Sequence, residues 1–209
     1  MRKTQKWHAD PLLHHPLLYR AMAVVPPTDP EFLRCFPLTL AQEDPDPTNW
    51  SDPKNFSDDP RDPGGATMGG VIQSEYNIYL KSQGLPQTSV RNITEAQGQD
   101  IYFHSYWLPH CPSLLPGMNL CIYDSCVNMG PTEATKILQV TLGLTNDGVW
   151  GPQTAARAAA LGPGNIVPAI ELFTKRREEV YRMMPDFKDF GTDWIRRAQQ
   201  IGQQALAMV

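Results

Sequence analysis

The chain has 209 residues, which is enough for one large domain or two small ones. Its hydrophobic content of 41% is ordinary for a globular protein, and no apolar run approaches the roughly 20 residues that span a bilayer, so we expect no membrane insertion. The net charge is −4 and the acids concentrate in residues 29–70, so we exclude nucleic acid, which needs a basic face, as a partner.

The first residues are basic, as in a secretory signal, but His, Asp and Pro interrupt the stretch that follows, where a signal needs an unbroken apolar core. We therefore predict no Sec signal. Residues 1–27 have no helical or strand period and are rich in Pro and His, which predicts an N-terminal extension that is packed on the domain or partly disordered.

The cysteines and histidines predict no metal site. Four cysteines (Cys35, Cys111, Cys121 and Cys126) form no CxxC pair and have no histidine at zinc spacing. We expect buried free thiols, with one disulfide as the alternative if the protein matures outside the cytoplasm. No Ser-His-Asp or Cys-His motif is present, and no cofactor is expected.

A first helix is predicted to begin after residue 28. Thr28 or Asp29 can cap it, and Pro30 suits its first turn. Pro37 is expected to kink or restart the helix. The helix must end near Glu43, because an Asp-Pro-Asp-Pro run follows and cannot continue it.

The next segment, residues 44–70, is dense in Pro, Asp, Asn and Gly and has almost no core formers. A loop of that length inside a compact domain is usually functional or disordered. Its last part predicts tight turns joined to short strands, so we expect a β-hairpin around residues 56–72.

The remainder is predicted to be helical. The stretch from 118 to 129 is apolar nearly all round, which predicts a central buried helix. The expected helices cover residues 74–82, 94–107, 118–129, 131–142, 152–161, 166–184 and 190–207.

Four stretches resemble glycoside hydrolase family 108. The sequence DDPRDPGGAT, followed by GGVI, is similar to the family signature, in which a helix ends in Glu-Gly-Gly-Tyr and continues through Asn-Asp-Pro, Asp-Pro-Gly-Gly and Thr to Gly-Ile-Thr. The stretches ITEAQGQDIYFHSYW and LLPGMNLCIYDSCVNMGP resemble two of its helices. The stretch QVTLGLTNDGVWGPQT resembles a turn of its predicted peptidoglycan-binding C-terminal region. The resemblance covers about residues 29–205.

The resemblance implies a mainly α, lysozyme-like α+β fold with a small β-hairpin lobe and a helical C-terminal region. Residues 28–130 would be the catalytic region, and residues 131–209 a peptidoglycan-binding region packed on it. The family's catalytic residues fall on Glu43 as general acid and on Asp59 and Thr67, which would position water. The hairpin would form one lip of a cleft, with the 118–129 helix as its floor and Glu43 facing Thr67 across it.

The resemblance further implies a peptidoglycan hydrolase, a lysozyme-type N-acetylmuramidase that cuts between N-acetylmuramic acid and N-acetylglucosamine. Aromatic side chains stack on sugar rings, although in a small helical domain they are more often core. The candidate substrate-binding residues are Trp50, Tyr76, Tyr106, Trp107 and Asn128, the last with a structural role as its alternative.

One departure keeps other readings open. The two glycines after the catalytic glutamate are missing, and an insertion of about ten residues, in 44–57, separates Glu43 from the hairpin. A non-catalytic wall-binding or phage-tail module is therefore the alternative function, and a lytic transglycosylase is a further one. The site of action would be the periplasm or cell wall. Three routes to the wall stay open. The first is release by a holin, as for an endolysin of phage or prophage origin, the second is delivery on a phage tail, and the third is transport by a dedicated export system.

Overall fold

The computed structural model describes residues 27–43, 50, 52–58 and 65–209, so nearly all of the predicted N-terminal extension lies outside the described residues. The chain divides into two compact units between Leu108 and Pro109. The described part is mostly helical with one small sheet, which confirms the predicted lysozyme-like α+β class. The predicted functional division near residue 130 stays a prediction.

Helix α1 (Pro30–Glu43) opens the described part of the first unit. Asp29, rather than Thr28, caps it, because its Oδ1 accepts two backbone N–H groups of the first turn at 3.0 Å each. The helix continues through Pro37 and is not restarted there. Pro37 and Leu33, four residues earlier, are both exposed, so water can reach the carbonyl that loses its helical donor.

The predicted hairpin is part of a three-stranded antiparallel sheet of order β1-β2-β3. The strands are β1 (Phe56–Ser57), β2 (Thr67–Met68) and β3 (Val71–Ile72), with a 3-10 turn, η2 (Pro53–Asn55), before β1. The turn between β2 and β3 consists of Gly69 and Gly70, whose φ angles are 52° and 78°. A two-residue hairpin turn of this kind needs positive φ at both positions, and glycine adopts it without steric cost.

Helices complete the first unit, and they differ from prediction at one place. They are α2 (Gln73–Ser82), η3 (Val90–Asn92), α3 (Glu95–Tyr102) and a π-helix, η4 (Phe103–Trp107). Thr94 caps α3 as predicted and forms a full capping box with Gln97. The single helix expected over 94–107 is thus an α-helix followed by a π-helical turn.

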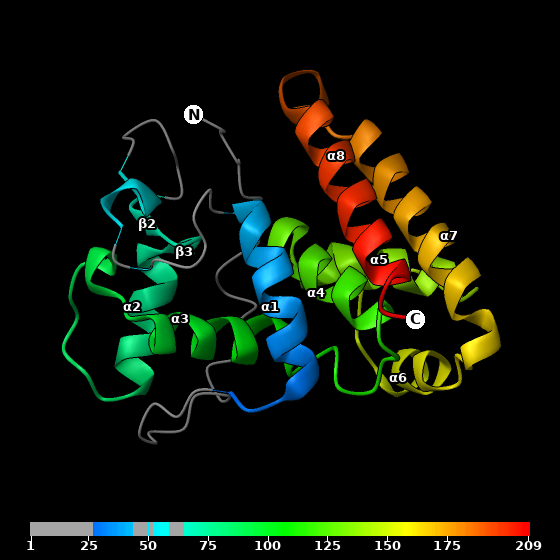
Figure 1. The fold of residues 1–209 in the computed structure, drawn as a ribbon, viewed down its shortest axis with the longest axis horizontal. Coiled ribbons are helices and arrows are strands. Elements are labelled where there is room, and N and C mark those ends of the chain that lie inside the picture. The colour runs from blue at the N-terminus through cyan, green and yellow to red at the C-terminus, as the bar shows by residue number, and fades with distance from the viewer. Residues whose placement is uncertain (1–26, 44–49, 51, 59–64) are drawn as a thin grey trace. The chain divides into compact units, whose positions relative to one another are not determined.

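The second unit consists of five helices within the described residues, and their existence and order confirm the prediction (Figure 1). They are α4 (Met118–Met129), α5 (Pro131–Thr141), α6 (Pro152–Ala159), α7 (Pro163–Arg182) and α8 (Phe187–Leu206). All twelve residues of α4 are buried. Helices α7 and α8 pack side by side as an antiparallel pair, and both contact α4. None of the helices in the described ranges has the length and apolar character that a membrane crossing requires.

Candidate active site

Glu43, the predicted general acid, is the last residue of α1 and is half-buried. The core holds the helix through its apolar face. Phe32 is fully buried, and its ring packs edge-on against those of Phe103 and Trp107, with centroids 5.1 and 5.7 Å away. The candidate acid therefore ends a helix whose position the core of the first unit fixes.

Thr67, the predicted hairpin hydroxyl, lies in the central strand of the sheet. The register pairs it with Ser57 on one side and with Ile72 on the other. Its neighbour Met68 pairs with Val71, and both of these are buried in the core. Successive side chains of a strand point to opposite faces of the sheet. Thr67 and the two residues paired with it, Ser57 and Ile72, therefore lie on the face that points away from that core. The Thr67 hydroxyl donates to the carbonyl two residues earlier at 3.2 Å.

Asp59, the predicted hairpin carboxylate, lies outside the described residues. The described residues on either side of that gap are Asp58, which directly follows β1, and Gly65, which precedes β2 by two residues. Because β1 pairs with β2, the described residues Asp58 and Gly65 both lie near Thr67. Glu43 and Thr67 belong to the same compact unit. The convergence of the three side chains on one groove stays a prediction.

Trp50 is buried, with 6% of its surface exposed. Two glycines leave room for its indole: a Cβ added at Gly69 would lie 2.8 Å from the ring, and one at Gly98 would lie 2.2 Å from it. The ring therefore fills a slot between the β2–β3 turn and α3. Tyr102 donates to the Gly69 carbonyl at 3.2 Å and so holds the same turn. This burial favours the core role for Trp50 over sugar stacking.

Tyr76 and Trp107, two other predicted sugar-stacking residues, are also in the core, each with 1% exposed. The Tyr76 hydroxyl donates to Gln97 at 3.0 Å, and burial raises the pKa of Tyr76. The Trp107 Nε1–H donates to Asp29 at 3.2 Å, so the residue that caps α1 also ties that helix to η4. These contacts favour structural roles for both rings.

Tyr106 differs from the other three candidate aromatics, because it is half-buried rather than buried. It lies in the π-helix η4, and its hydroxyl donates to Glu75 at 3.1 Å. In the same turn His104 pairs with Asp100 at 3.0 Å, and this hydrogen bond raises the pKa of His104. Single π-turns of this kind occur often at functional sites. Tyr106 therefore remains the best-exposed of the four candidate rings.

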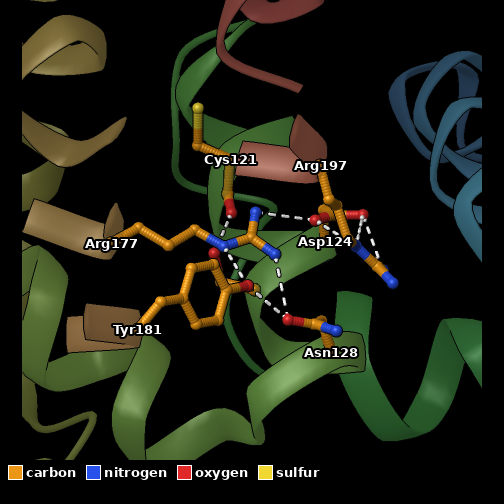
Figure 2. Close-up of polar contacts among 7 residues, drawn as sticks. Cys121, Asp124, Asn128, Arg177, Tyr181 and Arg197 are labelled. Carbon is orange, nitrogen blue, oxygen red and sulfur yellow. Dashed lines mark hydrogen bonds and ion pairs between the residues drawn. The ribbon is translucent and has the colours of Figure 1, made fainter. Parts of the chain in front are cut away.

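Asn128 belongs to a buried polar cluster on α4, α7 and α8 (Figure 2). Its side-chain oxygen accepts from Arg177 at 3.3 Å and from the Tyr181 hydroxyl. One turn earlier on α4, Asp124 accepts from Arg177 at 2.7 Å and from Arg197 at 2.8 Å. Asn128 is 5% exposed, so the structural alternative is favoured over substrate contact.

In this cluster one carboxylate, that of Asp124, faces two guanidinium groups. Burial acts to raise the pKa of Asp124, but Arg197 and Arg177 outweigh it and hold the pKa below the usual range. Neither arginine stands out as a site residue in the sequence alone. A signal was present, because an aspartate within an otherwise apolar helix can stay ionised in a core only if cations from elsewhere in the chain reach it.

All four cysteines are free and buried, as predicted. Burial raises the pKa of Cys121 to about 12 and also raises that of Cys126, so both thiols stay protonated and unreactive at neutral pH. Across the described ranges, no group of three or more His, Cys, Asp or Glu side chains is arranged to hold a metal ion.

The chain resembles known proteins in sequence and in structure. Residues 54–130 match the family model of glycosyl hydrolase 108. The match includes Thr67 and the buried helix α4, and it begins after Glu43 and Trp50. No curated protein sequence matches significantly. The solved structure of SagA from Brucella abortus is similar with a TM-score of 0.67 and 26% sequence identity, covering 85% of this chain and 94% of that one.

The family match covers the hairpin and the buried helix α4. The residues directly after Glu43 that depart from the family signature lie before the matched stretch. Residues 54–130 thus resemble glycosyl hydrolase family 108, and the two similarities together support a peptidoglycan hydrolase of the lysozyme-like type.

Proposed function

We propose that the protein is an N-acetylmuramidase, which hydrolyses the β-1,4 bond between N-acetylmuramic acid and N-acetylglucosamine in peptidoglycan. Glu43 is the general acid, and Asp59 and Thr67 position the attacking water. The sheet register is the observation that supports this assignment most directly. Because Met68 and Val71 are buried on one face, Thr67 projects from the other, where a substrate can reach its hydroxyl.

The proposed chemistry needs only carboxyl groups and water. Glu43 gives its proton to the glycosidic oxygen while the bond from that oxygen to the anomeric carbon breaks. The water oxygen forms the new bond to that carbon, and the proton that it loses passes to Asp59. This route inverts the anomeric centre and needs carboxyl groups about 6.5–9.5 Å apart, whereas a nucleophilic Asp59 about 5 Å away would retain the configuration.

Binding of the glycan rests on stacking and hydrogen bonds, because its backbone is neutral. Tyr106 is the candidate stacking residue, since its ring is half-buried and its hydroxyl is fixed by Glu75. Residues 131–209 are proposed to hold the chain on the wall. The site of action is the periplasm or cell wall, reached in the manner of an endolysin with a holin, by tail-borne delivery or by a dedicated export system.

The decisive experiment compares Glu43→Gln with a matched control on purified peptidoglycan. Glu31 lies in the first turn of the same helix and pairs with Arg34 on the surface at 2.8 Å, so Glu31→Gln is that control. Released muropeptides are separated by mass. We expect Glu43→Gln to lose at least about a hundredfold in rate with unchanged folding, because general acid catalysis contributes about that much. Full activity in this variant would exclude Glu43 as the acid.

A non-catalytic wall-binding or phage-tail module is the second candidate. The observation that favours it is the missing Gly-Gly pair after Glu43, together with a family match that begins only at residue 54. A pull-down on insoluble peptidoglycan separates the two functions, since binding without release of muropeptides identifies the module. Products ending in 1,6-anhydro sugars would instead identify a lytic transglycosylase, which uses no water.

A further inference from the structure

Strand β1 (Phe56–Ser57) lies directly beside the strand that holds Thr67. It pairs with β2 along both of its residues. It also lies within the stretch that matches the family model, so it belongs to the same sheet as the proposed hairpin residue.

The register places one residue of β1 next to the proposed water site. Ser57 stands directly opposite Thr67 in the antiparallel pair. Side chains of directly opposed residues share a face of the sheet, with Cβ atoms about 5 Å apart. The row Ser57–Thr67–Ile72 is therefore on the face away from the core, and Ser57 is exposed on it. Two hydroxyls at that spacing can both reach one water, at about 2.8 Å each.

Several contacts of Trp50, Asn55 and Phe56 hold β1 and the described residues before it in place. Trp50 fills the slot at Gly69, and a few residues later the Asn55 carbonyl accepts from the Gly69 N–H at 3.3 Å. In β1 itself, the Arg91 guanidinium lies over the Phe56 ring, 4.1 Å from its centroid. The segment is thus attached to the rest of the unit before and within β1.

We propose that Ser57 is a positioning residue, which holds the attacking water together with Thr67. This inference rests on the proposed muramidase function and adds to it a residue that is not among Glu43, Asp59 and Thr67. Ser57 forms no bond to the substrate. It orients the water whose oxygen attacks the anomeric carbon, and it accepts or donates one hydrogen bond to that water.

The test measures kcat and KM for release of muropeptides by wild type, Ser57→Ala, Ser57→Thr, Thr67→Ala and the double alanine variant. Ser74→Ala, an exposed serine in the first turn of α2, is the control. We expect Ser57→Ala to lower kcat about tenfold, the size of one net hydrogen bond, with KM changed less than about twofold. The Ser57→Thr variant keeps the hydroxyl and retains most of the activity.

The double variant tests the shared water. If both hydroxyls hold one molecule, the double variant is about as slow as the worse single variant, because their effects are not additive. Wild-type activity in Ser57→Ala would overturn the role of Ser57 and leave the muramidase assignment standing, as would fully multiplicative losses. A wild-type protein that releases no muropeptides would overturn the muramidase assignment itself, and with it the role of Ser57.

Discussion

Gly98→Ala probes how tightly Trp50 is held between α3 and the hairpin turn. In an unobstructed helix interior this substitution stabilises by about 1 kcal/mol, because glycine loses more backbone entropy on folding. Here the new Cβ would lie 2.2 Å from the nearest atom of the Trp50 ring, well inside the ordinary contact distance of about 3.5 Å. Whether Gly98→Ala raises or lowers the free energy of unfolding therefore depends on whether the Trp50 indole can move away from the new Cβ.

The ring has little room to retreat, because a Cβ at Gly69 would lie only 2.8 Å from it. Overpacking with small shifts costs about 1–3 kcal/mol. Expelling the indole forfeits its burial, and truncation of a buried tryptophan costs about 3–5 kcal/mol. The required shift exceeds what small relaxations supply, so we expect the ring to leave. After the gain in helix propensity, the net loss is about 2–4 kcal/mol.

The measurement is urea unfolding followed by circular dichroism, with the midpoint and the slope fitted separately. Gly164→Ala is the control, because Gly164 is also helical and no heavy atom lies within 4 Å of its added Cβ, so this variant should be unchanged or slightly more stable. In a Trp50→Phe background, whose ring is smaller, Gly98→Ala should lose most of its penalty. A Gly98→Ala protein as stable as wild type would refute the seating of Trp50 in the slot.

Two further predictions concern titratable groups. Asp124→Asn leaves Arg177 and Arg197 buried without their counter-charge, so urea unfolding should show a loss of about 3–5 kcal/mol. Because the folded pKa of Asp124 is lowered, its contribution to stability is present above the unfolded pKa of about 3.9 and is lost as the pH falls through the folded value; the variant should lack this acid-side loss. The raised pKa of His104, caused by its bond to Asp100, means that its contribution is complete below about pH 6.5 and disappears as the pH rises through the folded value. His104→Gln should therefore flatten the fall in stability that begins above about pH 6.5, and an unchanged profile would contradict the pairing.

Much of the secondary structure could be predicted from the sequence, because its signals are local. The Asp-Pro run after Glu43 ends α1, and Thr94 caps α3, as expected. The twelve apolar-rich residues from Met118 predict a buried helix, and α4 has those bounds. Each of these features depends on contacts within one or two helical turns, which a short stretch of sequence specifies.

Local rules failed where a distant partner decided the outcome. Pro37 does not break α1, because the helix packs its other face on the core and leaves the affected carbonyl to water. The π-turn η4 replaces the end of a predicted α-helix, and the Tyr106 hydroxyl in it donates to Glu75, 31 positions earlier in the chain. No spacing within the segment itself marks this partner.

By itself the sequence determined the helices, their order and the identity of Glu43 and Thr67 as candidates, since capping, periodicity and motif are properties of neighbouring residues. Only the tertiary structure decided that Ser57 stands opposite Thr67 in the sheet and that Trp50 fills a slot between two glycines. It also brought Arg197 to Asp124 across 73 positions. Such contacts are selected by packing and charge compensation among residues far apart in the chain, and no local pattern encodes which residues will meet.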